Sequence, residues 1–150
     1  LSQRHYYQSL SVIAIPPQSR IFVVVEAIDF RNGINGLGKI CRRVIHQDPT
    51  TGAIFIFKNK RNTSVKLLVY DGEAFWLINR RLSRGKLRWW PNNDGTSCSL
   101  TSKELQTILM NGNPSQAEFS SDWKRLIAWR DGPRPSIYIA LLLWHVSQTK

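Results

Sequence analysis

The sequence is poor in the residue types that build metal centres, disulfide frameworks and membrane spans. Its 150 residues include only two cysteines and three histidines. Cys41 and Cys98 lie far apart without a Cys-x-x-Cys pair, so we expect neither a zinc site nor disulfides, and a reducing cytoplasm suits the chain. The longest apolar run, residues 137–146, is about half of the roughly 20 residues that a membrane-spanning helix needs. The polar segment "LSQRHYYQS" lacks the apolar stretch of a signal peptide, and we expect no membrane contact.

Acidic residues are also scarce. The chain carries 10 Asp and Glu against 21 Lys and Arg, which gives a net charge of +11. Such a balance favours a polyanionic partner such as nucleic acid or an anionic membrane. The length and the 42% hydrophobic content suit one folded domain. We expect an N-terminal extension over residues 1–15, a core over 16–126 and a C-terminal tail over 127–150.

The first elements are a strand and an amphipathic helix. The segment "RIFVVVEAIDF", residues 20–30, has the β-branched and aromatic content of a buried strand. From Ile34 onward, apolar residues recur at helical spacing through Ile45, and basic residues gather on the opposite side. We expect the Asp48-Pro49 pair to end this helix, because a residue before proline avoids the helical region.

A β-meander is predicted next, from "GAIFIFKN", "SVKLLVYDGEAFWLINRR" and "GKLRWW". A two-residue turn at Asp71-Gly72 would pair Tyr70 with Glu73 and place a fully apolar set on one face, our predicted core. That register also pairs Leu68 with Phe75 and Lys66 with Leu77. The predicted core face consists of Val65, Leu67, Val69, Ala74, Trp76 and Ile78.

The length that we expect for the second connection of the meander follows from which side chains each loop would bury. A four-residue loop over 82–85 pairs Arg81 with Lys86 and Ile78 with Trp89, and it sends Leu87 and Trp89 to the core. A three-residue loop would instead bury arginines without partners, which is costly.

A second helix closes the central region. In "LTSKELQTILMNG", Thr101 and Glu104 have the spacing of a capping box, and Asn111-Gly112 marks the end. We therefore expect an α+β fold, in which an antiparallel β-meander of about four to five strands packs with two or three helices.

The segment "GINGLGKI" resembles the sequence motif of a phosphate-binding loop but lacks one of its residues. The spacing G-x-x-x-x-G-K is present through Lys39, yet Ile40 replaces the Ser or Thr whose hydroxyl holds magnesium. We expect no nucleotide cofactor and no other cofactor.

Carboxylates offer a weak case for catalysis. Asp48, Asp71 and Asp94 precede Pro or Gly and are explained by turns, whereas Asp29 suits either a cap or a metal-dependent nuclease. We assign no catalytic residue and no metal ligand, and we keep the nuclease as an alternative based on Asp29.

Basic and aromatic residues form the candidate nucleic-acid surface. Between residues 58 and 90 there are nine Lys or Arg and two acids, Asp71 and Glu73. Such a face can neutralise phosphates and stack on bases, or it can be an ordinary solvated or helix-covered face. The candidate residues, which include three from the basic side of the first helix, are Lys39, Arg42, Arg43, Lys66, Arg81, Lys86, Arg88 and Trp90.

Four ordered blocks resemble one family of mobile-element proteins. They are "PPQSRIFVVVEAIDFRNGINGL", "DPTTGAIFIFKNKRNTSVKLLVYDG", "RRLSRGKLRWWP" and "LTSKELQTIL", which together cover about residues 16–110. They resemble the TnpB-type accessory protein encoded by the second reading frame of insertion sequences of the sixty-six family. The first block fits an Asp-x-Arg-x-Gly-x-x-Gly-Leu pattern through Asp29 and Arg31, and the second an Asp-Pro-x-x-Gly-x-x-Phe-x-Phe pattern.

The resemblance implies a non-catalytic accessory role in transposition, in a bacterial cytoplasm and near the nucleoid where DNA is bound. The expected partners are DNA, a separate transposase and other proteins of the element. An adaptor that contacts the transposase and touches DNA weakly remains an alternative, and the sequence leaves the oligomeric state open.

Overall fold

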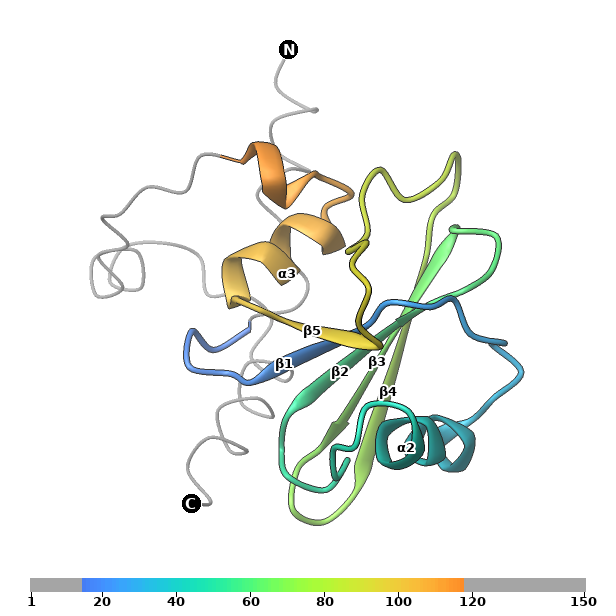
Figure 1. Cartoon of the computed structure of the whole chain (residues 1–150), viewed down its shortest axis with the longest axis vertical. Coiled ribbons are helices and arrows are strands. Elements are labelled where there is room, and N and C mark those ends of the chain that lie inside the picture. Colours follow the sequence, from blue (N-terminus) through green and yellow to red (C-terminus); the bar gives the residue numbers. More distant parts are fainter. Residues whose placement is uncertain (1–14, 118–150) are drawn as a thin grey trace.

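A five-stranded mixed sheet with one helix on each face forms the centre of the molecule (Figure 1). The computed structural model describes residues 15–117, so the predicted C-terminal tail and nearly all of the N-terminal extension lie outside the described residues. The strand order is β4-β3-β2-β1-β5. The elements are β1 (Ile21–Val24), α2 (Ile34–Arg43), β2 (Ile54–Lys58), β3 (Ser64–Tyr70), β4 (Phe75–Arg81), β5 (Ser97–Leu100), α3 (Ser102–Leu109) and the 3-10 turn η1 (Pro114–Gln116). The α+β class is confirmed.

The first two strands are parallel, with α2 as the crossover between them. Phe22 pairs with Phe55 in this register, and their rings stack with centroids 5.5 Å apart. Parallel neighbours need such a crossover, whereas a hairpin can only join antiparallel ones. The purely antiparallel meander that we expected is therefore confined to β2, β3 and β4.

The helix α2 is shorter than its apolar pattern suggested. It ends at Arg43, and His46 adopts a left-handed backbone with φ of 53°, so the chain leaves the helix before Asp48-Pro49. Leu37 and Cys41 are buried against the sheet, but Val44 is exposed.

The turn between β3 and β4 is longer than predicted. Tyr70 pairs with Phe75, not with Glu73, and residues 71–74 form the turn. The Asp71 carboxylate accepts hydrogen bonds from the backbone N–H groups of Glu73 and Ala74 at 2.9 and 2.8 Å, which stabilises the four-residue connection. Because the register differs by two residues, each strand side chain stays on the face we expected.

The segment "GKLRWW" is a loop rather than a strand. The backbone N–H of Leu87 donates to the Asn62 carbonyl at 2.7 Å, and that of Arg88 donates to the Asn111 side chain at 2.9 Å. The predicted pairings of Arg81 with Lys86 and of Ile78 with Trp89 are therefore wrong. The next strand is β5, which sequence patterning missed and which pairs antiparallel with β1.

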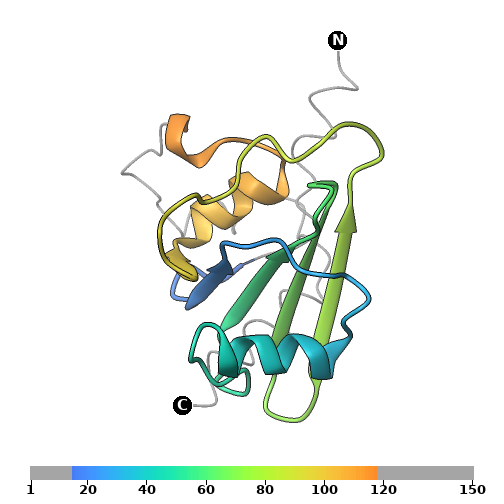
Figure 2. The ribbon, with the colours of Figure 1, turned by 45° about the vertical axis from the view of Figure 1, so that its right-hand side comes forward.

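Both faces of the central strands β1, β2 and β3 are buried, with one helix on each side of the sheet (Figure 2), whereas no residue of the edge strand β4 is fully buried. On the α3 side, Leu105 and Leu109 pack against the inward residues of β1, β2 and β3. This confirms Val65, Leu67 and Val69 as core residues, but the prediction was wrong for Ala74 and Trp76, which are exposed. On the α2 side, the cluster consists of Val24, Ile28, Leu37, Cys41, Ile45, Ala53, Phe55, Phe57 and Leu68.

The capping box of α3 is confirmed. The Thr101 hydroxyl accepts from the backbone N–H of Glu104, and the Glu104 carboxylate accepts from that of Thr101 at 2.7 Å. The helix ends as the Asn111-Gly112 pair predicted, with Asn111 at φ of 58°. Within residues 15–117, no helix is long and apolar enough to cross a membrane.

Leu105→Ala should destabilise the protein by about 2–5 kcal/mol, because it opens a cavity at a fully buried side chain. The matched control is Met110→Ala at the end of the same helix, where the side chain is 52% exposed and the expected change is within about 0.5 kcal/mol. Urea unfolding measures both. Equal losses for the two variants would contradict the placement of α3 on the core.

Candidate nucleic-acid interface

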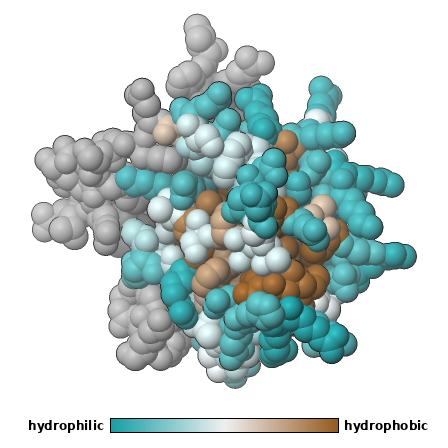
Figure 3. All heavy atoms as spheres, viewed as in Figure 1, coloured by the Kyte–Doolittle hydropathy of each residue, from teal (hydrophilic) through white to brown (hydrophobic). Residues whose placement is uncertain are grey.

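The β3–β4 hairpin separates the charges of the central region. Its two acids, Asp71 and Glu73, lie in the turn at one end. At the other end the turn over 59–63 meets the loop over 82–88, where the N–H of Leu82 donates to the Thr63 carbonyl at 2.9 Å. We call this region the basic end; its residues are Lys58, Lys60, Arg61, Arg80, Arg81, Arg84, Lys86 and Arg88. Figure 3 shows hydrophilic side chains projecting at the upper right, where Figure 1 places the loops of this end.

Three of the predicted contact residues lie at the basic end. Arg81, Lys86 and Arg88 are all exposed. The Asn111 side chain accepts from the Arg88 N–H and donates to the Lys86 carbonyl at 3.4 Å, so the end of α3 holds this part of the loop. Sequence reasoning missed Lys60, Arg61 and Arg84. The hairpin pattern could have indicated them, because it puts both connections at the same end.

Trp90 is placed differently from our expectation. It is half-buried and packs against the α3-side core, and its indole N–H donates to the Val24 carbonyl at 3.1 Å. The physical reason is the absence of a strand here, since the loop turns Trp90 inward. Its ring also lies 5.8 Å from the Lys58 ammonium.

The basic side of α2 forms a second surface. Lys39, Arg42 and Arg43 are exposed there, and Figures 1 and 2 both place α2 toward the β3–β4 turn, away from the loop over 82–88. The segment that resembled a phosphate-binding loop is helical from Ile34, and Gly38 is buried within α2. These three residues therefore form a surface of their own.

The sheet face that we named as a candidate contact surface, open or helix-covered, is largely covered by α2. Lys66, Phe75, Leu77 and Arg81 do share one side of β3 and β4, as expected. However, Phe75 and Leu77 pack against the cluster beneath α2, because the crossover helix lies on this side. The face does not offer a flat platform for stacked bases.

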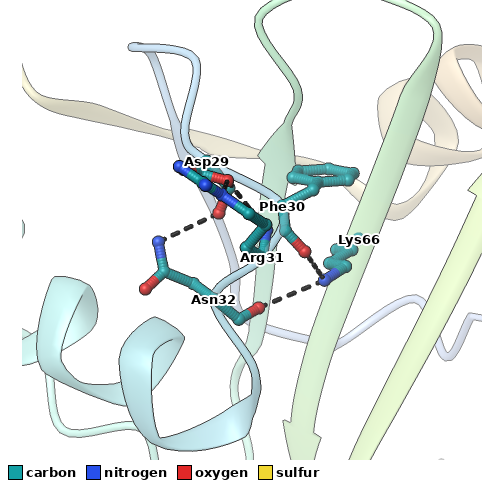
Figure 4. A network of polar contacts seen from close by, with 5 residues as sticks. All are labelled: Asp29, Phe30, Arg31, Asn32 and Lys66. Carbon is teal, nitrogen blue, oxygen red and sulfur yellow. Dashed lines mark hydrogen bonds and ion pairs between the residues drawn. The ribbon is translucent and has the colours of Figure 1, made fainter.

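Lys66 makes internal contacts. Its side chain is 9% exposed, and its ammonium donates to the carbonyls of Phe30 at 2.7 Å and Asn32 at 3.1 Å (Figure 4). The ammonium also lies 4.9 Å from the centre of the Phe30 ring, in a cation–π contact. Lys66 therefore ties β3 to the loop that leads into α2, and it lies away from the surface that DNA could reach.

The loop over 29–33 is ordered by local hydrogen bonds. The Arg31 guanidinium donates to both oxygens of the Asp29 carboxylate, and the side chain of Asn32 donates to the Asp29 carbonyl. Hydrogen bonds from the side chain and then the backbone of Arg31 lower the pKa of Asp29 from 3.8 to about 2. A Cβ at Gly36 would lie 2.5 Å from the Asn32 side-chain oxygen, which explains glycine there.

Asp48 and Asp71 also have local roles. Asp48 accepts from the N–H and the hydroxyl of Thr50, and Asp71 stabilises its turn. Within residues 15–117, no three His, Cys, Asp or Glu residues are grouped closely enough to hold a metal ion. Burial raises the pKa of the Cys41 thiol to about 12, which makes it a poor nucleophile.

Comparisons with known proteins point to one family. The family model described as "IS66 Orf2 like protein" matches residues 19–118. The chain is 36% identical over 76 residues to "Uncharacterized protein y4jC" of Sinorhizobium fredii, covering 51% of this chain and 65% of that protein, slightly less than two thirds of its length. It is 26% identical over 90 residues to "Uncharacterized protein y4hO" of the same organism, covering 60% and 77%. No solved structure matches.

Lys66→Met should destabilise the protein by about 1–3 kcal/mol, because it leaves two carbonyls without their charged donor. Lys60→Met, at an exposed position, is the control and should change the unfolding free energy by about 0.5 kcal/mol or less. Urea unfolding of both variants provides the measurement. If Lys66→Met were no worse than the control, the internal role of Lys66 would be wrong.

Carboxyl NMR titration should show Asp29 still ionised at pH 3, with its pKa near 2. Since the folded-state pKa is depressed, the Asp29–Arg31 contact is fully present above 3.8 and is lost as the pH falls through about 2. Arg31→Gln should raise the pKa of Asp29 toward 3.8, because it removes the largest cause of the shift. Arg84→Gln removes the same charge elsewhere and should leave the pKa near 2. Identical titrations in the two variants would refute this assignment.

Proposed function

This chain belongs to the IS66 Orf2-like protein family, and from that membership we propose that it is a non-catalytic accessory protein of insertion-sequence transposition that binds DNA. Its partner in that role would be a separate transposase. The observation that carries the DNA part is the basic end, where eight Lys and Arg gather while the two acids of the same region lie in the opposite turn. The proposed site of action is the bacterial cytoplasm, at the nucleoid.

The arrangement of charges supports contact with the DNA phosphate backbone more than recognition of the bases. Lys and Arg side chains at loops neutralise phosphates and release bound counterions, which gives affinity without sequence preference. The covered sheet face and the inward Trp90 leave little aromatic surface for stacking on bases. We therefore propose that the basic end binds the phosphate backbone of DNA, with Arg81, Lys86 and Arg88 among the contact residues.

The local roles of the aspartates support a non-catalytic reading. Asp29 is neutralised by Arg31, and Asp48 and Asp71 accept hydrogen bonds within their own turns. A metal-dependent nuclease would need several carboxylates converging on one point. An accessory role requires no such convergence.

Fluorescence anisotropy of the full chain with a labelled duplex from the end of an insertion sequence should show affinity that falls steeply with salt. The triple variant Arg81→Ala, Lys86→Ala, Arg88→Ala should reduce the slope of log affinity against log salt by about 1–3, since each lost phosphate contact removes about 0.9. The matched control is Lys39→Ala, Arg42→Ala, Arg43→Ala, which changes the net charge equally at α2.

Each alternative has its own result in this experiment. A reduced slope for the α2 triple alone would move the interface to that helix. No detectable binding of the unmodified chain at low salt would exclude DNA contact and leave the transposase adaptor as the better reading.

A further inference from the structure

Two half-buried cations flank one buried valine on the α3 side of the sheet. In the strand register, Lys58 of β2 pairs with Val65 of β3, and Val65 pairs with Arg80 of β4. Cross-strand partners lie on the same face, so the three side chains form one row across three strands. Lys58 and Arg80 both belong to the basic end, but unlike its exposed members they are partly withdrawn from water.

Neither cation has an anionic partner within residues 15–117. The Nη1 atom of Arg80 is buried and makes no hydrogen bond, and the ion pair found in this part of the chain joins Arg31 to Asp29 instead. Burial lowers the pKa of Lys58 and also that of Arg80. A buried cation is normally paired with an anion, because an unpaired one costs free energy.

The surroundings hold this pair in place. The ring of Trp90 lies 5.8 Å from the Lys58 ammonium, and the Trp90 indole is fixed to the Val24 carbonyl. Leu87 is anchored through its N–H to the Asn62 carbonyl and packs on the same core. The two cations therefore stand on a rigid sheet beside an anchored loop, which reduces the entropy that a ligand must remove.

We infer that Lys58 and Arg80 form an oxyanion site that takes one phosphate group of a DNA backbone. A planar guanidinium and an ammonium on one row match the several oxygens of a phosphate. The surrounding basic end favours a polyphosphate chain over an isolated carboxylate. This inference rests on the proposed DNA binding and gives it a fixed anchoring point, distinct from the exposed residues around it.

Thermal unfolding of the full chain in inorganic phosphate, against sodium chloride of equal ionic strength, tests the site. The unmodified chain should show a saturable rise in Tm, because a ligand that binds the folded state stabilises it. Arg80→Met should lose that rise, and in chloride it should unfold at the same Tm or higher, since the unpaired buried charge is gone. Arg43→Met, at an exposed arginine of α2 outside the basic end, is the matched control and should keep the rise.

Duplex binding by anisotropy separates this inference from the proposed function. Arg80→Met should weaken binding about tenfold, the loss of one charge-assisted contact, and Arg43→Met by about twofold or less. A lost phosphate effect with unchanged duplex binding would refute the DNA assignment of the site. If the unmodified chain keeps the phosphate effect, binds no duplex and is stabilised by polyglutamate, the proposed function fails and the site takes a protein carboxylate instead.

A structural role for Arg80 predicts the opposite pattern. Arg80→Met would then lower the Tm in chloride and keep the full phosphate effect, which would overturn the inference. Lys58→Met provides the second check on the pair and should reduce the phosphate effect as well.

Discussion

The hydrogen bonds from the Lys66 ammonium to the carbonyls of Phe30 and Asn32 join the two halves of the structure. On one side of this contact lies the β3–β4 hairpin, next to the basic end, and on the other lies the loop that leads into α2. The crossover helix can cover its face of the sheet only where that loop is held against β3. The Lys66 ammonium, which the sequence pattern predicted to contact nucleic acid, thus stabilises the fold instead. Charged donors suit this role, because they form the stronger hydrogen bonds.

Hairpin topology is the second organising constraint, since it turns a mixed stretch of sequence into a polarised surface. Residues 58–90 carry both acids and bases, but strands of equal length put alternate connections at opposite ends. The acids fall in one connection, and the bases other than Lys66 fall in the two opposite connections or at the strand ends beside them. A domain of this size can therefore present a concentrated positive field at one end while the faces of its central strands stay largely apolar and buried.

Local patterns predicted those parts of the fold that local interactions decide. The helix α3 followed from its capping box, and β2, β3 and β4 from their apolar runs. The turn register did not follow, because the carboxylate of Asp71 stabilises a four-residue connection where Asp-Gly favours a two-residue one. The strand β5 escaped notice since "SCSL" has little apolar pattern and becomes a strand by pairing with β1.

The candidate site was predictable to a similar degree. Charge and strand patterning indicated Arg81, Lys86 and Arg88 as candidates, and the structure places all three at exposed positions of the basic end. The sequence could not show that Lys66 and Trp90 are turned inward, because the burial of a side chain depends on which element packs against its face of the sheet. The crossover that covers Lys66 and the loop that turns Trp90 inward are both tertiary features.

The position of β1 between β2 and β5 has a consequence of another kind. One side of β1 has no backbone partner until residues 97–100 have been synthesised, so the nascent chain exposes one unpaired edge of this strand until then.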